Sequence, residues 1–308
     1  MFKSLLLKHI YRNKAVYLLL LPGLAFYIIF CYIPMFGLQI AFKDFMANKG
    51  FWGSPWNDFQ SFKFLLKDFD FWRAVKNTIT ISSLSILIIT PFPILLAILI
   101  SEFKDGLYKK VLQTVFTFPH FITWVVMSGI IYNLLGSSGS VNTLLLMLGY
   151  ESRNFLGDTA LFRPIVFVSS ILKEAGWSSI IYLATIAGIN PELYDAVTVD
   201  GANRFKKIIH ITLPSLMPTI TILFILHVGR IMDFNFDMIF NLYNPVVYPV
   251  ADIIDTYIYR ISFPSALSSS TADFGYTTAV GLFKSVINFI LLLIANKSVK
   301  LFGQDGLI

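Results

Sequence analysis

The sequence predicts an all-α integral membrane protein with six membrane-spanning helices. Of its 308 residues, 56% are apolar and only 14% are charged, whereas soluble domains average roughly 45–50% and about 25%. The mean hydropathy is +0.70. The charges lie in clusters between long apolar runs, so we expect the net charge of +6 to reflect membrane orientation and not nucleic-acid binding. This composition excludes an ordinary soluble globular domain.

Six apolar stretches are long enough to cross a hydrocarbon core of about 30 Å, which takes roughly 20 helical residues. They cover residues 15–42, 77–101, 111–135, 162–189, 214–236 and 274–295. The first follows a basic head, as in a signal peptide, but its apolar run exceeds the roughly 7–15 residues of a signal-peptide core. We therefore interpret it as a helix that spans the membrane, and we expect residues 1–308 to form a single transmembrane domain.

The distribution of Lys and Arg predicts the orientation. With the N-terminus inside, the inner segments hold twelve Lys and Arg residues in short stretches, and the outer side holds nine spread over longer loops. Cytoplasmic loops carry the excess of these residues, so both termini are predicted to be cytoplasmic. Outer loops are expected over residues 43–73 and 236–273. The first is rich in Phe and Trp, which favours an interfacial amphipathic segment over a partner contact.

Residues 190–213, between the fourth and fifth spans, read as two short cytoplasmic helices joined by a sharp turn. Asn190 can cap the first helix, whose first position then holds Pro191. Gly201 can end this helix in a left-handed conformation, and Asn203 can cap the second helix. Pro214 is then expected to mark the return to the membrane. An amphipathic helix placed here can insert its apolar face into a groove on a partner.

This segment resembles the EAA loop of ABC importer permeases, whose pattern is E-A-A-x-x-D-G-A followed by I-x-L-P. The matching residues are Asp195, Ala196, Val197, Asp200, Gly201, Ala202, Ile211, Leu213 and Pro214. Asp195 replaces the usual glutamate, and Val197 replaces an alanine. Residues 190–295, together with the N-terminal stretch YLLLLPGLAFYIIFCYIPMFGLQIAFKDF, look similar to the polysaccharide-type sugar permeases of Firmicutes.

The resemblance implies the transmembrane domain of a type I ABC importer, a multi-pass permease subunit for oligosaccharides in the bacterial plasma membrane. The implied partners are a second homologous permease, two copies of an ATPase subunit that hold ATP and Mg, and an extracellular solute-binding lipoprotein. The implied ATPase-coupling residues are Asp195, Ala196, Val197, Asp200, Gly201, Ala202, Asn203, Arg204 and Phe205. Alternatives are a permease for a non-sugar solute, a stand-alone secondary transporter, and a loop that merely connects two spans.

The chain shows no motif for chemistry of its own. It lacks the G-x-x-x-x-G-K-[ST] phosphate loop, so we expect it neither to bind nor to hydrolyse ATP and to be a transport subunit, not an enzyme. The four histidines have no metal-ligand spacing. Cys31 is the single cysteine, so no internal disulfide can form. We therefore predict no cofactor, metal or catalytic residue in this chain.

Polar side chains within the apolar spans are candidates for a substrate path, because such groups normally face a water-filled cavity or one another. The candidates are Lys173, Glu174, Trp177 and Tyr182 in the fourth span and Arg230, Asp233, Asn235 and Asp237 in the fifth. Arg230, Asp233 and Asp237 have i, i+3, i+7 spacing, which would place them on one helix face. Structural ion pairs are the alternative. Lys284, in the sixth span, is expected either to snorkel or to pair with a neighbouring subunit.

Overall fold

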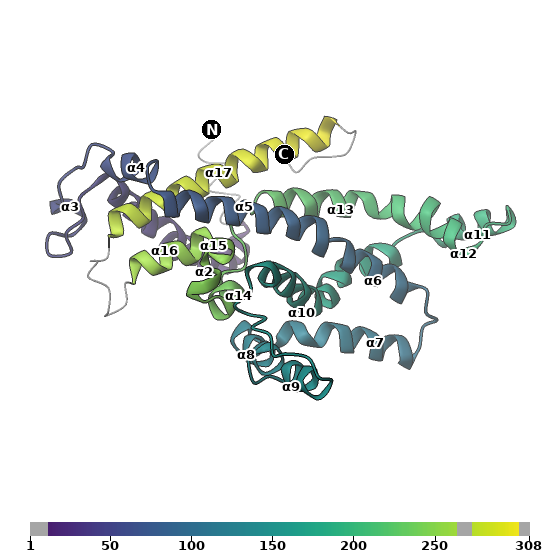
Figure 1. The fold of residues 1–308 in the computed structure, drawn as a ribbon. Helices are drawn as coiled ribbons and strands as arrows, with labels where there is room; N and C mark the ends of the chain where they lie inside the picture. Colours follow the sequence, from purple (N-terminus) through teal and green to yellow (C-terminus); the bar gives the residue numbers. More distant parts are fainter. Residues whose placement is uncertain (1–11, 264–272, 302–308) are drawn as a thin grey trace. The chain divides into compact units, whose positions relative to one another are not determined.

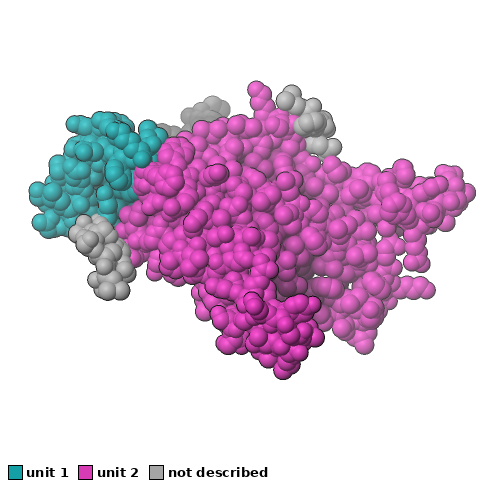
Figure 2. All heavy atoms as spheres, viewed as in Figure 1, with its two compact units in different colours: residues 1–67, 264–282 teal, residues 68–263, 283–308 magenta. Residues whose placement is uncertain are grey.

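The computed structural model describes residues 12–263 and 273–301, and the described residues are almost entirely helical (Figure 1). The chain divides into two compact units, residues 1–67 with 264–282 and residues 68–263 with 283–308 (Figure 2). Within these described ranges, six helices are long and apolar enough to cross a membrane, which confirms the predicted fold class. They cover Lys14–Phe42, Phe69–Ser101, Trp124–Met147, Thr159–Ala187, Arg204–Val228 and Phe274–Lys300.

The first unit contains the first span, a short segment after it and the start of the last helix. Its elements are α2 (Lys14–Phe26), the π-helical η1 (Tyr27–Tyr32), the 3-10 helical η2 (Ile33–Phe42), α3 (Gly50–Gly53), α4 (Gln60–Leu65) and the first turns of α17 (Phe274–Leu301). Side chains from Lys14 to Phe36 are exposed, as expected for a helix that lipid or another subunit covers. Trp52 and Trp56 are also largely exposed.

The second unit contains the other spans and most of the segment between the fifth span and the last helix. Its elements are α5 (Phe69–Ile89), α6 (Pro91–Ser101), α7 (Leu107–Thr117), η3 (Phe118–Phe121), α8 (Trp124–Leu135), α9 (Ser140–Met147), α10 (Thr159–Ala187), α11 (Pro191–Val199), α12 (Arg204–Lys207), η4 (Ile208–Thr212), α13 (Leu213–Val228), α14 (Phe236–Leu242), η5 (Pro245–Val247), α15 (Tyr248–Ala251), α16 (Ile254–Ser262) and the rest of α17. The predicted outer loop 236–273 is therefore largely helical, and its residues 264–272 lie outside the described residues.

The second span begins at Phe69, eight residues before its predicted start at Asn77. The Asp68 carboxylate accepts hydrogen bonds from the backbone N–H groups of Asp70 and Phe71 and so caps the helix. The side chain of Phe71 is fully buried. Residues 69–73 thus belong to the second span and not to the first outer loop.

The prediction of one continuous third helix over 111–135 is wrong. After α7 the chain forms the short 3-10 turn η3 and then becomes extended at Ile122 and Thr123, where ψ is 129° and 154°. Pro119 cannot donate a helical hydrogen bond, and the Thr123 hydroxyl caps the new helix α8 by accepting from the Val126 N–H. The apolar run did not reveal this break, because both sides of it are equally apolar.

The predicted limits of the fifth span, 214–236, are also wrong. The helix runs from Arg204 to Val228 without interruption. Pro214 lies within it, because the π-helical turn η4 precedes the proline and accommodates its missing N–H. The chain then turns before α14 begins at Phe236. Arg230, Asp233 and Asp237 consequently do not share a helix face.

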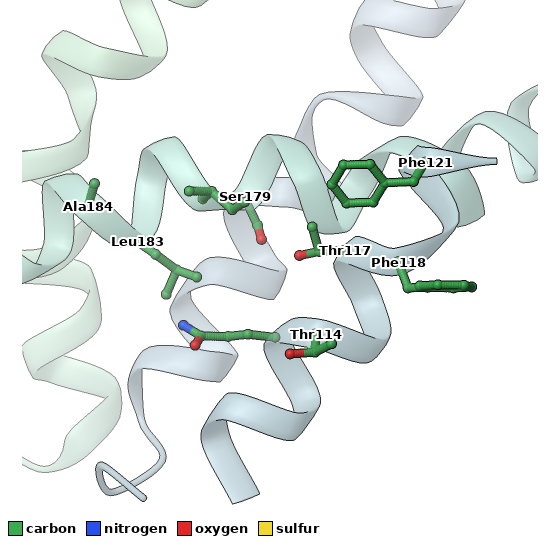
Figure 3. A pocket seen from close by; sticks show the side chains of 9 residues that line it. Thr114, Thr117, Phe118, Phe121, Ser179, Leu183 and Ala184 are labelled. Atoms are coloured by element: carbon green, nitrogen blue, oxygen red, sulfur yellow. The ribbon is translucent and has the colours of Figure 1, made fainter. Parts of the chain in front are cut away.

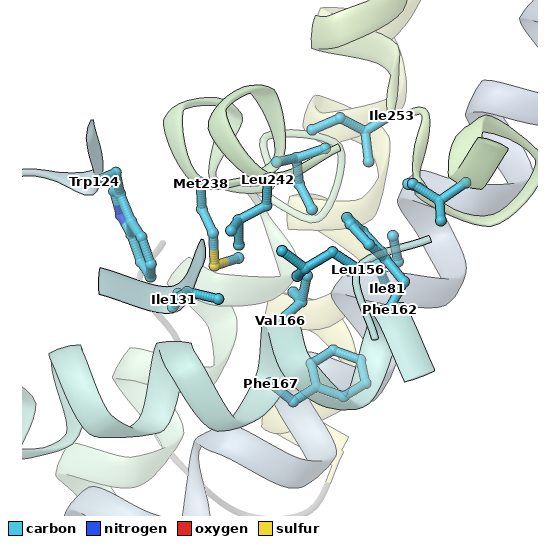
Figure 4. Close-up of a cluster of buried hydrophobic side chains, with 13 residues drawn as sticks. Ile81, Trp124, Ile131, Leu156, Phe162, Val166, Phe167, Met238, Leu242 and Ile253 are labelled. Atoms are coloured by element: carbon cyan, nitrogen blue, oxygen red, sulfur yellow. The ribbon is translucent and has the colours of Figure 1, made fainter. Parts of the chain in front are cut away.

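The core of the second unit lies where α5, α8 and α10 meet the 236–253 segment (Figure 4). Asn77 and Arg163 hold that segment to the spans. The Asn77 amide donates to the carbonyls of Pro249 and Asp252, and the Arg163 guanidinium donates to Asn77 Oδ1 and to the Val250 carbonyl. The core residues are Ile81, Trp124, Ile131, Leu156, Phe162, Val166, Phe167, Met238, Ile239, Leu242, Val247, Ala251 and Ile253.

Gly176 permits a close approach between α10 and the junction of α7 and η3. A Cβ atom at this position would lie 1.9 Å from the Phe116 carbonyl oxygen and 2.7 Å from the Thr117 nitrogen. Both atoms belong to the backbone, so no side-chain rotation can make room. Glycine is therefore required for these two helices to pack at this distance.

Candidate functional site

Residues 190–203 form the first predicted helix and the turn after it, whereas the second predicted helix, which begins at Arg204, is continuous with the fifth span and is not a separate short helix. Asn190 Oδ1 accepts from the Glu192 N–H at 3.0 Å and caps α11, which has Pro191 at its first position. Asn203 Oδ1 accepts from the Lys206 N–H at 2.9 Å and caps α12. These two caps satisfy N–H groups that the first turn of a helix leaves without a backbone partner.

Gly201 terminates α11 in the left-handed conformation, with φ of +76°. The Gly201 N–H donates to the Thr198 carbonyl, and the Ala202 N–H donates to the Val197 carbonyl, both at 3.0 Å. This pair of bonds is the Schellman motif, in which the left-handed residue is usually glycine. No atom lies within 4 Å of a Cβ placed on Gly201, so the side of the turn is open.

The turn between the two helices presents apolar side chains to the exterior. In Figure 1, α11 and α12 form the tip at one end of α13. Val199 is 89% exposed and Phe205 is 67% exposed. The Tyr194 hydroxyl forms a 2.9 Å hydrogen bond with Thr212 Oγ1, which ties the tip to the start of the fifth span. The tip is therefore an anchored structure with an uncovered apolar surface, which is typical of an interaction site.

Four of the predicted coupling residues, Asp195, Asp200, Asn203 and Arg204, expose polar side chains at this tip. Ala196 is exposed, whereas Val197 and Ala202 are half-buried.

The two groups of predicted path residues meet at one cavity of about 430 Å³ between α5, α10, α13 and the turn after α13. This volume lies within the roughly 300–1,000 Å³ typical of small-molecule sites. Five of the eight candidates line it, namely Glu174, Trp177, Tyr182, Arg230 and Asp233. The other three do not. Lys173 is buried behind the wall, Asn235 caps α14, and Asp237 is exposed on α14.

His120 organises the wall of the cavity around Glu174, a role that the sequence did not indicate. His120 Nδ1 lies 2.7 Å from Glu174 Oε2, and its ring stacks on Trp177 with centroids 4.4 Å apart. The Lys173 ammonium donates to the His120 carbonyl at 2.7 Å and pairs with Glu174 Oε1 at 3.2 Å. The break in the third span thus places His120 beside α10, and Lys173 and Glu174 form an internal ion pair.

Lys284 links α17 to the turn after α13 and to α16. Its ammonium lies 2.5 Å from Asp233 Oδ1 and 2.5 Å from Asp255 Oδ1, so the lysine pairs within this chain. The other oxygen of Asp233 accepts from the Asn288 amide at 2.6 Å. Burial raises the pKa of the Asp255 carboxyl group, and its bond to Lys284 opposes this shift. Both carboxylate oxygens of Asp233 therefore already have partners.

Small polar residues complete the cavity lining, and the sequence analysis did not single them out. Ser82 and Ser85 on α5 and His227 near the end of α13 face it. Ser82 is 5% exposed, and its hydroxyl has no partner within the described part of the protein. The sequence does contain a pattern that could have predicted them. The run ISSLSI has three serines, and repeated hydroxyl groups in an apolar span indicate a polar helix face.

A larger cavity of about 560 Å³ lies on the opposite face of α10, against α7 and η3 (Figure 3). Phe118, Phe121 and Leu183 contribute apolar surface, and Thr114 and Thr117 contribute hydroxyls. None of its lining residues carries a charge. The smaller cavity is therefore the better candidate for recognition of a polar solute.

The fold and the cavity define an integral membrane transport component with six spans. The chain belongs to the family of binding-protein-dependent transport system inner membrane components, which matches residues 89–301. It is accordingly a permease subunit of a binding-protein-dependent ABC importer, a transport subunit and not an enzyme, and a separate ATPase subunit hydrolyses ATP.

Individual relatives match nearly the whole chain. Protein LplB of Bacillus subtilis is 40% identical over 297 residues, which are 96% of this chain and 92% of that protein. The polygalacturonan/rhamnogalacturonan transport system permease protein YteP of the same organism is 39% identical, with 99% and 93% covered.

A crystal structure of a bacterial ABC transporter involved in the import of the acidic polysaccharide alginate contains a similar chain. The two chains are 41% identical, with a TM-score of 0.86 and coverage of 96% and 98%. The alginate transporter in complex with its pentasaccharide-bound periplasmic protein also matches, at 40% identity, the same TM-score and coverage of 97% and 99%.

Proposed function

We propose that this permease carries oligosaccharides through the cavity between α5, α10 and α13. One observation supports this most strongly, namely that the cavity combines an aromatic face with hydrogen-bonding groups. Trp177 lines the cavity and is 44% exposed, so its uncovered surface can receive the apolar C–H face of a sugar ring. The unpartnered Ser82 hydroxyl can bond a sugar hydroxyl.

The importer is proposed to consist of this chain, a second homologous permease, two ATPase subunits with ATP and Mg, and an extracellular binding lipoprotein. The exposed tip formed by α11 and α12 is the proposed contact with the ATPase. Val199 and Phe205 would insert into a groove of that subunit, and Gly201 would allow the turn to approach it. The relatives named for transport of polygalacturonan, rhamnogalacturonan and alginate support an oligosaccharide as the cargo.

The proposed orientation places both termini in the cytoplasm of a bacterial cell, with the tip inside and residues 43–67 outside. It can be tested with single cysteines in a Cys31→Ser background, because Cys31 is exposed. Ser54 is buried and unsuitable for labelling, whereas Asn48 and Lys104 are exposed. An impermeant thiol reagent added to intact cells should label Asn48→Cys and spare Lys104→Cys. The reverse pattern would reject this orientation.

The transport proposal is tested by uptake into liposomes that contain the whole complex. The substrates are oligosaccharides of two to five residues, with peptides of the same lengths as the competing class. We expect ATP-dependent uptake of an oligosaccharide and none of the peptides. Trp177→Ala should reduce uptake by about fivefold or more, because stacked aromatic contacts contribute roughly 0.5–1.5 kcal/mol beyond burial.

Ile180→Ala is the matched control for Trp177→Ala, since Ile180 lies on the same helix but lines the other cavity. Uptake of peptides alone, or equal loss in both variants, would contradict the proposed path. Uptake by this chain without its partners would favour a secondary transporter.

A further inference from the structure

We propose that Arg230 binds the carboxylate of an acidic sugar, so that the cavity selects uronate-containing oligosaccharides over neutral ones. This inference rests on the proposed function, because it assigns the charge of the cargo at the same cavity. The basis for the inference is that some of the charged groups lining the cavity already have a partner within this chain and one does not. Three residues with full charges line it, namely Glu174, Arg230 and Asp233.

The two carboxylates are committed to partners within the protein. Glu174 places one oxygen 3.2 Å from the Lys173 ammonium and the other 2.7 Å from His120 Nδ1. Asp233 uses one oxygen for Lys284 and the other for the Asn288 amide. A carboxylate whose two oxygens are paired in this way offers little attraction to a passing sugar.

Arg230 is in the opposite situation. Its backbone N–H donates to the His227 carbonyl in the turn that ends α13, and the residue is exposed at the cavity wall. Within the described residues, the guanidinium has no ion pair or hydrogen bond. Among the described residues, Glu174 and Asp233 pair with other groups and form no ion pair with Arg230. The cavity therefore contains one uncommitted cation, attached to a short turn at the end of a span.

A guanidinium is suited to recognise a carboxylate, because its planar set of donors matches the two oxygens of the acid. A neutral oligosaccharide offers only hydroxyl groups at the same place. Such groups can accept single hydrogen bonds from Arg230, but they do not compensate its charge. The exposed face of Trp177 lines the same cavity and can stack on the ring of the same sugar, whether or not that sugar is acidic.

The test uses the complete importer in liposomes with two matched probes, a trigalacturonate and the same trisaccharide after reduction of its carboxylates to hydroxymethyl groups. Uptake of each is measured at saturating binding protein for the wild type, Arg230→Gln, Arg230→Lys and the control Arg153→Gln. Arg153 is an exposed arginine outside the cavity that pairs with Asp158. The binding protein is the same throughout, so a change in the ratio of the two uptakes reports this chain alone.

We expect Arg230→Gln to lower trigalacturonate uptake about tenfold and to change uptake of the reduced trisaccharide by less than about twofold, as for loss of one charge-assisted contact. Arg230→Lys should retain an intermediate ratio, and Arg153→Gln should keep the wild-type ratio. An unchanged ratio in Arg230→Gln overturns the inference and leaves oligosaccharide transport standing. Equal loss of both probes also overturns it, since it would show that Arg230 pairs with another subunit. If no oligosaccharide is imported by the wild type, the proposed function fails as well.

Discussion

Substitutions at Gly201 can distinguish two requirements at the tip of this permease, a left-handed backbone conformation and free space for a partner. The first demand is backbone geometry, because φ at Gly201 is +76°. The left-handed conformation costs a residue with a side chain roughly 1–2 kcal/mol, although asparagine adopts this conformation more readily than other residues do. The second demand is free space around the residue. No atom of this chain lies within 4 Å of a Cβ at this position, so even a large side chain meets no obstacle inside the permease.

The three variants Gly201→Asn, Gly201→Ala and Gly201→Trp therefore give a graded test. Asn should leave uptake close to wild type. Ala should reduce it by about twofold to tenfold, because the strain of roughly 1–2 kcal/mol lowers the fraction of properly folded tips. Trp carries the same kind of backbone strain as Ala, so any further loss has to come from a surface outside this chain.

The assay is membrane abundance, co-purification of the ATPase and oligosaccharide uptake for each variant. We expect all three variants to insert normally, since α11 and the turn lie outside the spans. Gly201→Trp should lose both uptake and the ATPase. If Gly201→Trp behaves like Gly201→Ala, nothing docks against the turn. Normal uptake by both would show that residues 190–213 are only a connection, and the coupling assignment would be withdrawn.

Three further predictions follow from contacts in the second unit. Gly176→Ala should prevent formation of a stable complex, because its Cβ would lie 1.9 Å from the Phe116 carbonyl oxygen, whereas Gly129→Ala, with no atom within 4 Å, should leave the melting temperature within a few degrees of wild type. Lys284→Met should lower the melting temperature of the complex by leaving Asp233 and Asp255 facing each other without their shared cation, and Asp255→Asn added to it should restore part of that loss. Asn77→Leu should loosen the 248–252 segment and increase hydrogen exchange there, while Thr80→Val, a partly exposed site on the same helix, should not. Unchanged hydrogen exchange in Asn77→Leu would contradict the role of Asn77 in holding this segment to the spans.

Sequence patterns were sufficient for features that depend on local backbone chemistry. Asn190, Gly201 and Asn203 occupy the capping positions expected of them, because capping involves only residues a few positions apart. The number of spans also followed from apolar length alone. The limits of spans were less predictable, since the capping of α5 by Asp68 and the π-helical turn before Pro214 extend helices beyond their apolar cores.

The cavity was only partly predictable, because its members come from segments far apart in the chain. The polar residues of α10 and of the turn after α13 stood out against apolar surroundings, and five of them do meet. Their mutual pairing was not visible, since Lys284 reaches Asp233 across 51 positions and His120 reaches Glu174 across 54. The helix break that places His120 there depends on Pro119 and the Thr123 cap, which the continuous apolar run concealed.

The contact at Gly176 has a consequence for how this subunit moves. Backbone atoms of α7 and α10 touch with no side chains between them, so neither helix can rotate about its own axis or slide along the other without a collision. The two helices must therefore travel together during any rearrangement, and with them the cavities on both faces of α10. Any movement of the tip relative to the spans therefore has to occur at another place in the chain. The π-helical turn η4 joins the tip to α13, and helices bend most readily at such turns, so we expect bending there.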